Sequence, residues 1–189
     1  MISAILLAAG QSQRMKGQNK LLKHYKGKYL INHILNTLVK SKVNNIFLVL
    51  GFQNLKVRKI IIKSKKIQCI YNKKFKSGLS SSIQAGLNKI SKKNIGFLIV
   101  HADMPLISKG IINILCSVVK NKDKEIFVPV HKKKLGNPLA FKYSMIKSLK
   151  KIKGDRGAKK LIKSNKSKVQ LVKMKSKSIL IDFDQLKDF

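Results

Sequence analysis

The residues best suited to bind an anion lie in the loop LLAAGQSQRMKGQNK near the start of the chain. Gly10 follows a short apolar run, and a glycine there lets backbone N–H groups approach a ligand closely. Arg14 and Lys20 supply a guanidinium and an ammonium group, which together can neutralise a polyphosphate. The loop fits neither the Walker A pattern nor the dinucleotide fingerprint GxGxxG. It predicts a nucleotide or phosphate site of another kind, and an ordinary solvated strand-to-helix loop carries equal weight.

A second stretch, KSGLSSSIQAGL, combines Gly78 with three consecutive hydroxyl side chains. Ser80, Ser81 or Ser82 can cap a following helix by accepting hydrogen bonds from the N–H groups of its first turn. N–H groups left uncapped at such a helix start suit an anion or the edge of a base. A cap is the commoner arrangement, so this stretch alone predicts a helix start and leaves a ligand site open.

A third stretch, FLIVHADMPLI, places Asp103 directly after a predicted buried strand, which Pro105 prevents from continuing. A carboxylate facing a triphosphate is the usual way in which proteins hold Mg²⁺, together with waters and substrate oxygens. The alternative is a cap on a helix that begins near Ser108. Only 7 acidic residues stand against 42 basic ones, and this scarcity favours the magnesium site.

The last third of the chain adds an amide and several carboxylates. GNPLAF places Asn137 in a Gly/Pro turn, and GDRGAKKL places Asp155 where it can cap a helix. ILIDFDQLKDF ends a predicted strand with Asp182 and Asp184. Residues two apart share one face of a strand, so both carboxylates are candidates for one metal ion or substrate phosphate. Asp188 is interpreted as a surface residue.

The net charge of +35 predicts attraction to nucleic acid or to anionic membranes. The lysines, however, spread through every segment, and aromatic residues do not interleave with them to make base-stacking platforms. We therefore expect general steering of anionic ligands and no specific nucleic-acid site. A basic nucleic-acid-binding protein is the alternative of another class, and a steep loss of binding with salt would identify it.

The two cysteines, Cys69 and Cys116, lie far apart and form no CxxC pair, so neither a disulfide nor a zinc site is predicted. No apolar stretch approaches the roughly 18 residues that span a bilayer. The N-terminal apolar run is also too short for a signal peptide and lacks its basic start. We expect a cytoplasmic protein without membrane attachment.

Short apolar runs alternate with segments of helical periodicity. Such runs are typical of strands buried on both faces of a parallel sheet, and they are Ile2–Ala8, Ile46–Leu50, Ile67–Tyr71, Phe97–Ala102 and Ile126–Val130. Three apolar helix faces are made by Leu30, Ile31, Ile34, Leu35, Leu38 and Val39, by Ile83, Leu87 and Ile90, and by Ile111, Ile112, Leu115, Val118 and Val119. The alternation predicts an α/β fold with helices on both faces of a mostly parallel sheet.

The pattern becomes irregular after Val130. HKKKLGNPLAF predicts a hairpin, residues 143–151 and 157–163 predict helices, and residues 169–172 and 178–182 predict short strands. No linker or repeat divides the 189 residues, which predicts one domain over residues 1–189. Ligands of open parallel sheets bind outside the carboxyl ends of the strands. The N-terminal loop and Asp103 both follow predicted strands and are therefore expected at one edge of the sheet.

Six motifs occur in the order and approximate spacing of the MobA-like nucleotidyltransferases, and the sequence most closely resembles their molybdenum cofactor cytidylyltransferases. The motifs are LLAAGQSQRM with Lys20, GLSSSIQAGL, ADMPLI, GNPLAF, GDRGAKKLI and IDFDQLKDF. The resemblance covers essentially the whole chain. It implies a Rossmann-like, three-layer fold of the nucleotide-diphospho-sugar-transferase type with an irregular C-terminal third. It also implies Mg²⁺-dependent transfer of a nucleoside monophosphate from an NTP to a phosphorylated acceptor, with release of pyrophosphate.

The resemblance also implies roles for particular residues. Arg14, Lys20 and Asp103 would be catalytic, and Asp103 would hold Mg²⁺ with Asp182 or Asp184 as a second carboxylate. Asn137, Asp155 and Arg156 would lie toward the acceptor. The implied nucleotide-binding residues are Leu7, Ala8, Ala9, Gly10, Ser12, Arg14, Lys20, Gly78, Ser80, Ser81 and Ser82.

The resemblance favours CTP, because LAAG stands where guanylyl-transferring relatives usually read LAGG. It implies molybdopterin as the acceptor, and a molybdoenzyme or cofactor chaperone as a partner. Two positions depart from the family pattern: Lys16 replaces a common glycine, and DFDQLKD lacks the usual Thr-Pro-Glu. The second departure leaves open which of Asp182 and Asp184 binds metal. A sugar-phosphate acceptor, a GTP donor and a non-catalytic maturation factor for a molybdenum enzyme are the alternatives.

Overall fold

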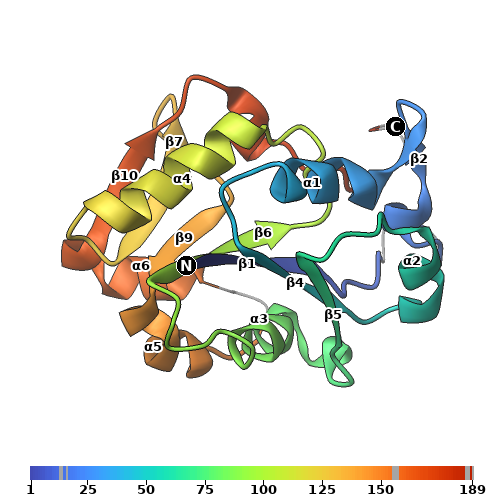
Figure 1. The fold of residues 1–189 in the computed structure, drawn as a ribbon, viewed down its shortest axis with the longest axis horizontal. Helices are drawn as coiled ribbons and strands as arrows, with labels where there is room; N and C mark the ends of the chain where they lie inside the picture. Colours follow the sequence, from blue (N-terminus) through green and yellow to red (C-terminus); the bar gives the residue numbers. More distant parts are fainter. Residues whose placement is uncertain (13–14, 16, 155–157, 186–187, 189) are drawn as a thin grey trace.

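A computed structural model describes the chain apart from residues 13–14, 16, 155–157, 186–187 and 189 (Figure 1). The expected positions Arg14, Lys16, Asp155 and Arg156 lie outside the described residues.

The central sheet runs in the order β10-β7-β9-β6-β1-β4-β5 across the described residues, and β8 pairs with β7. The pairs β1–β4, β1–β6, β4–β5 and β7–β10 are parallel, whereas β9 runs antiparallel to both β6 and β7. The strands are β1 (Ile2–Ala8), β4 (Asn45–Leu50), β5 (Ile67–Tyr71), β6 (Gly96–His101), β7 (Ile126–His131), β8 (Lys134–Leu135), β9 (Leu139–Lys142) and β10 (Val169–Lys173). The mostly parallel α/β sheet predicted from the sequence is confirmed.

Continuous apolar sequence forms the middle of this sheet, because every residue of β1 is buried and β4 is buried from its second residue on. The antiparallel pair β2 (His24–Tyr25) and β3 (Lys28–Tyr29) lies apart from the central sheet. Its turn contains Lys26 and Gly27, both with positive φ.

Helices cover both faces of the sheet, as Figure 1 shows for α1 and α4 on one side and α3 and α5 on the other. Each face has its own apolar core, one including Ile34 and Leu115 and the other including Ile83 and Leu149. The helices are α1 (Leu30–Val39), α2 (Asn54–Ile60), α3 (Leu79–Leu87), α4 (Lys109–Asn121), α5 (Ile146–Lys150) and α6 (Lys159–Ser164). No described helix has the length and apolar character needed to cross a bilayer.

The C-terminal third contains the predicted hairpin, since β7 and β8 pair antiparallel around Lys132 and Lys133. Both turn residues have positive φ, as two-residue hairpin turns of the most common type require. The helix expected over residues 143–151 appears as a 3₁₀ turn, η4 (Tyr143–Met145), followed by α5, and the strand expected at 169–172 is β10.

The strand expected at residues 178–182 was wrong. The 3₁₀ helix η6 (Lys177–Leu180) occupies this segment, because the Ser176 hydroxyl accepts a hydrogen bond from the Ser178 N–H and starts a turn. Ile179 is fully buried, and its carbonyl accepts the Asn137 N–H at 2.9 Å. The apolar residues of this segment therefore belong to a turn that packs one side against the core.

Candidate functional site

A pocket of about 500 Å³ opens at the carboxyl ends of β1 and β6. Its described lining residues come from five separate stretches of the chain. They are Leu7, Ala8, Ala9, Gly10, Gln11, Ser12, Lys20, Leu21, Phe75, Lys76, Gly78, Leu79, Ser82, His101, Ala102, Asp103 and Asp184. The strand-end rule applied to the sequence thus identified the correct edge of the sheet.

One ammonium group joins two carboxylates at one end of the pocket. Lys20 Nζ lies 2.6 Å from Asp103 Oδ2 and 2.5 Å from Asp184 Oδ1. Burial alone would lower the pKa of the Lys20 ammonium, but the negative charges and hydrogen bonds of Asp103 and Asp184 outweigh it and raise that pKa above 10.5. Lys20 is therefore a fixed positive charge at neutral pH.

The turn η2 (Lys20–Leu22) positions this lysine. Asn19 is 2% exposed, and its side chain accepts the Leu21 N–H while donating to the carbonyl of Phe52. The Lys20 N–H donates to Ser12 Oγ at 3.2 Å. These contacts fold the loop back on itself, so that Lys20 reaches the carboxyl end of β6.

Asp103 lies between β6 and α4, and its role as a cap on that helix is excluded. The N-cap of α4 is Ser108, whose hydroxyl accepts the Ile111 N–H at 3.3 Å. The Asp103 carbonyl accepts the Phe183 N–H, which ties the C-terminal segment to the pocket. The other carboxylate oxygen, Asp103 Oδ1, is buried and has no hydrogen-bond partner among the described residues.

Asp184 lines the pocket, whereas Asp182 does not and is exposed to solvent. The buried Phe183 separates them, and the segment is not a strand. Partial desolvation, together with the charges of Asp184 and Asp103, raises the pKa of Asp182. Asp188 is more than a surface residue, because its carboxylate accepts the N–H groups of Asp184 and Gln185 at 2.8 and 2.7 Å.

The three serines of α3 do not cap their helix, which corrects the expectation from the sequence. The N-cap is Gly78, with φ 93°, and no side chain caps this end. Asn72 instead donates from Nδ2 to Ser81 Oγ at 2.9 Å and to Ser82 Oγ at 3.1 Å. Ser82 lines the pocket, while Ser80 and Ser81 do not.

Close packing of three residues shapes the part of the pocket wall near the carboxyl end of β4. A Cβ atom added at Gly51 would lie 2.6 Å from Phe75 Cβ and 2.7 Å from the Ala9 carbonyl oxygen. Gly51 therefore allows Ala9 and Phe75 to approach each other closely. Ala9 and Phe75, together with Leu79, give the pocket an apolar surface, and Ser82 adds a hydroxyl group.

Most of the residues that the resemblance implied for nucleotide and metal do meet in this pocket. The structure brings together Leu7, Ala8, Ala9, Gly10, Ser12, Lys20, Gly78, Ser82, Asp103 and Asp184. It does not bring Ser80, Ser81, Asp182 or Asn137 to the pocket lining. Asn137 lies on the turn before β9, where its N–H bonds to Ile179.

The sequence analysis did not predict Phe75 and Lys76 as pocket residues, nor Asn72 as a partner of the pocket residue Ser82. All three follow the carboxyl end of β5, so the strand-end rule used for Asp103 would have found them. His101, the last residue of β6, also lines the pocket beside Asp103.

The carboxylate end fits a divalent cation. A buried carboxylate oxygen without a partner needs a positive ligand or a donor, and Asp103 Oδ1 is in that position among the described residues. No group of three or more His, Cys, Asp or Glu side chains is gathered for a metal within the described part of the chain. Two carboxylates without a full protein cage suit Mg²⁺, which keeps waters and takes substrate phosphates as further ligands.

A family model for the MobA-like NTP transferase domain matches residues 4–170. The chain belongs to the MobA-like NTP transferase family. This is the family that the six ordered motifs predicted, and residues 4–170 form its NTP transferase domain.

Curated relatives of this MobA-like NTP transferase include enzymes for different nucleotides. A probable molybdenum cofactor guanylyltransferase of Clostridium perfringens is 32% identical over 70% of this chain and 61% of its own length. An adenosylcobinamide-phosphate guanylyltransferase of Methanocaldococcus jannaschii is 30% identical over 72% of each chain. A 2-C-methyl-D-erythritol 4-phosphate cytidylyltransferase of Dehalococcoides mccartyi is 38% identical over 33% of this chain, which spans only 28% of that relative.

Solved structures confirm the fold of this MobA-like NTP transferase. Rv0371c from Mycobacterium tuberculosis H37Rv superposes with a TM-score of 0.87 at 22% identity, covering 99% of this chain and 94% of the other. A structure of Rv0371c in complex with manganese superposes with a TM-score of 0.81 at 21% identity, over 99% and 95% of the two chains.

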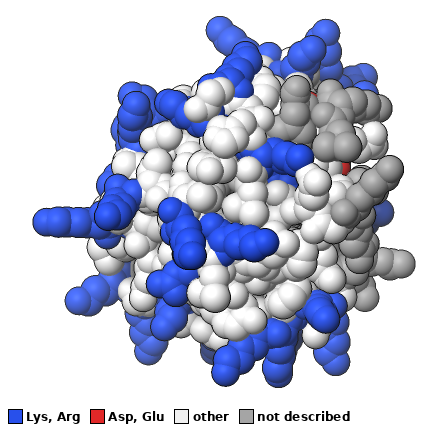
Figure 2. All heavy atoms as spheres, turned by 90° about the vertical axis from the view of Figure 1, so that its right-hand side faces the viewer, with Lys and Arg blue, Asp and Glu red and all other residues white. Residues whose placement is uncertain are grey.

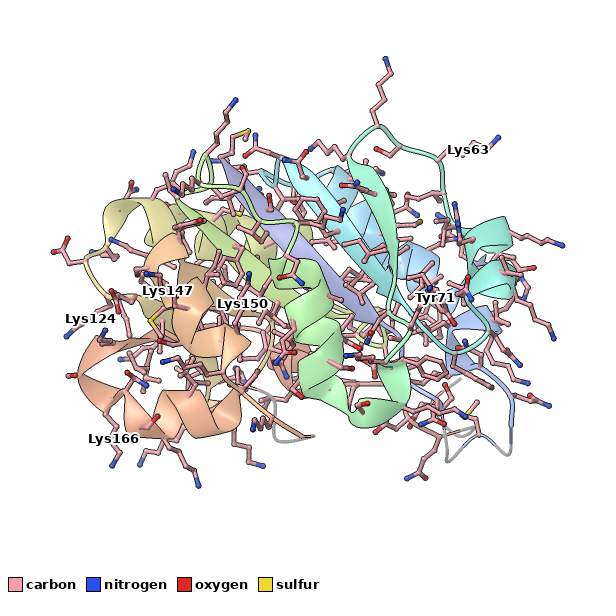
Figure 3. The ribbon with its side chains drawn as sticks, turned by 90° about the horizontal axis from the view of Figure 1, so that it is seen from below. Lys63, Tyr71, Lys124, Lys147, Lys150 and Lys166 are labelled. Atoms are coloured by element: carbon pink, nitrogen blue, oxygen red, sulfur yellow. The ribbon has the colours of Figure 1, made fainter. Side chains whose placement is uncertain are left out.

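Lysine side chains are scattered over this MobA-like NTP transferase. In Figure 2 blue lysine and arginine side chains lie both along the edges and near the centre of the face shown. In Figure 3 the labelled Lys147 and Lys150 lie on α5, whereas the labelled Lys63, Lys124 and Lys166 lie on other segments. All five are exposed. Exposed lysines distributed in this way attract anions in general.

Proposed function

We propose that this nucleotidyltransferase moves CMP from CTP to a phosphorylated acceptor, molybdopterin, and releases pyrophosphate. The observation that carries the proposal is the position of Lys20 Nζ, within 2.6 Å of Asp103 and 2.5 Å of Asp184 at one end of the pocket. A positive charge and two carboxylates, in one pocket with an apolar wall and a hydroxyl, suit the phosphates and the base of a nucleoside triphosphate.

In the proposed reaction an acceptor phosphate oxygen attacks the α-phosphorus of CTP in line. The new P–O bond forms as the bond from the α-phosphorus to the bridging oxygen breaks, and the electron pair leaves with pyrophosphate. No covalent enzyme intermediate is needed, so positioning and electrostatics carry the catalysis. Lys20 would neutralise the charge that develops on the leaving group, with Arg14 assigned the same task by family resemblance.

Asp103 and Asp184 are the described residues that would hold Mg²⁺. When bound, the ion would neutralise phosphate oxygens and polarise the α-phosphorus. Lys20, which lies between the two carboxylates, would be freed to turn toward the phosphates. The loop from Ala8 to Ser12 would bind through backbone N–H groups, because its side chains are small or polar.

The choice of CTP rests on Ala9, which is 4% exposed and lines the base end of the pocket. Its methyl group occupies space that a glycine would leave for a larger purine. GTP is the second candidate donor, since two relatives are named as guanylyltransferases. Replacing Ala9 with glycine is expected to raise the use of GTP relative to CTP.

A pyrophosphate-release assay with Mg²⁺ tests the proposal, using ATP, CTP, GTP and UTP in turn with molybdopterin and with several sugar phosphates. The expected result is release with CTP and molybdopterin together and little with either alone. Release only with GTP would overturn the choice of donor, and release only with a sugar phosphate would overturn the acceptor. No release with any pair would overturn catalysis itself and favour a maturation factor.

A further inference from the structure

The side chain of Asn72 is held in one orientation by its neighbours. Asn72 directly follows β5, whose last residue, Tyr71, is labelled in Figure 3, and it is 6% exposed. Its Oδ1 accepts the Lys74 N–H at 3.0 Å. A backbone N–H can only donate, so the oxygen of the amide must face Lys74 and the NH₂ group must face the serines.

The hydroxyl hydrogen of Ser81 is also assigned by its partners. Ser81 Oγ lies 2.8 Å from the carbonyl oxygens of both Lys74 and Gly78. Carbonyl oxygens only accept, so Ser81 donates to them and accepts from Asn72. Its hydrogen therefore stays within the loop and is not offered to a ligand.

Ser82 differs from Ser81 in one respect. Its oxygen accepts from Asn72 Nδ2 at 3.1 Å, and the described residues provide no acceptor for its own hydrogen. Ser82 is 5% exposed and lines the pocket. A buried hydroxyl hydrogen without an acceptor costs free energy, so the ligand is the natural source of that acceptor.

We propose that Asn72 is a positioning residue that fixes Ser82 as a hydrogen-bond donor to N3 of the cytosine base. This inference rests on the proposed function, because it assumes that the base occupies the end of the pocket formed by Ser82, Leu79 and Phe75. Lys20 and the carboxylates, which line the same pocket, suit the phosphates. N3 is an acceptor in cytosine but carries a hydrogen in uracil, so this one contact distinguishes two bases of nearly equal size.

The polarity of this contact can be reversed with a nearly isosteric change. In Asn72→Asp, one carboxylate oxygen keeps the Lys74 N–H and the other can only accept. The Ser82 hydrogen then turns toward residue 72, and Ser82 presents only lone pairs to the base. In Ser82→Ala the donor is removed without reversal.

The test measures kcat/KM for CTP and UTP by pyrophosphate release and takes their ratio. We expect the CTP:UTP ratio to fall in the order wild type, Ser82→Ala, Asn72→Asp, with a total change of about tenfold or more, since sites built to hydrogen-bond a substrate reject the mismatched one. Ser82→Thr keeps the hydroxyl and should retain most of the ratio. Thermal unfolding of each variant checks folding, and Ser82→Ala decides the outcome if Asn72→Asp does not fold.

A matched control separates polarity from charge. Ser77→Asp adds the same negative charge in the exposed turn η3 (Phe75–Ser77), at a residue that does not line the pocket. Its CTP:UTP ratio should equal that of the wild type even if both rates fall. An unchanged ratio in Ser82→Ala and Asn72→Asp would overturn this inference and leave nucleotidyl transfer intact. An inactive wild type with all four nucleotides would instead overturn the proposed function.

Discussion

Lys20 and Asp103 are 83 positions apart in the chain, yet Lys20 Nζ and Asp103 Oδ2 are separated by 2.6 Å. The same ammonium also contacts Asp184, 164 positions from Lys20. With side chains 14% and 18% exposed, Lys20 and Asp103 are screened only in part by solvent, so their interaction is stronger than that of a surface pair.

Asp103→Asn should abolish most Mg²⁺-dependent pyrophosphate release while leaving the fold intact. The substitution keeps the shape of the side chain but removes the charge that would hold the ion, and such losses commonly cost about 100-fold or more in kcat. Steady-state kinetics over a range of Mg²⁺ concentrations measure the effect. Turnover close to that of the wild type would show that Asp103 does not bind the metal ion.

Asp184→Asn should impair turnover far more than Asp182→Asn, because only Asp184 lines the pocket and contacts Lys20. The raised pKa of Asp182 means that its ionised form is disfavoured in the folded state. Stability that depends on this group therefore decreases as the pH rises through its pKa, and Asp182→Asn should unfold at a higher temperature than the wild type at neutral pH. Equal kinetic losses in the two variants would contradict the choice of Asp184.

Lys20→Met should weaken NTP binding and change the dependence of stability on pH. The folded-state pKa of Lys20 lies above its ordinary value of 10.5, so its contribution is fully present below pH 10.5 and is lost as the pH rises through the folded-state pKa. The free energy of unfolding of the wild type minus that of Lys20→Met should stay constant up to about pH 10.5 and decrease above it. Taking the difference cancels the titration of the other lysines, and a constant difference would refute the coupling.

Gly51→Ala should destabilise the protein and raise KM for the NTP. The new methyl group would lie 2.6 Å from Phe75 Cβ and 2.7 Å from the Ala9 carbonyl oxygen. Overpacking of this kind costs about 1–3 kcal/mol of unfolding free energy, and here it displaces two residues of the pocket wall.

Gly110→Ala is the matched control for Gly51→Ala. It lies in α4, and the nearest atom to an added Cβ would be Ser108 Oγ at 3.6 Å. The change should stabilise the helix by about 0.5–1 kcal/mol and leave KM unaltered. Urea denaturation and pyrophosphate release report both quantities, and similar stability changes at the two glycines would contradict the packing argument.

The strands and helices of the first two thirds could be predicted closely from the sequence. Residues 2–8 and 67–71 were predicted as strands with their observed ends. Short, mainly apolar runs bounded by polar residues are typical of strands in a sheet. The strand predicted at residues 178–182 was wrong, because a short apolar run can also pack one side of a 3₁₀ turn against the core. The three serines were also misleading, since Ser81 and Ser82 accept hydrogen bonds from Asn72 and none of the three caps the helix.

The sequence by itself determined the class of the fold, the family and the short list of chemically suitable residues. These depend on local periodicity and on motif order, both of which are written along the chain. Only the tertiary structure decided that Lys20, Asp103 and Asp184 meet, that Asp184 and not Asp182 lines the pocket, and that Ser82 alone of its serines reaches it. Contacts between residues so far apart depend on the order in which the strands pair and on which side chains point away from the core. No local sequence pattern specifies either of these.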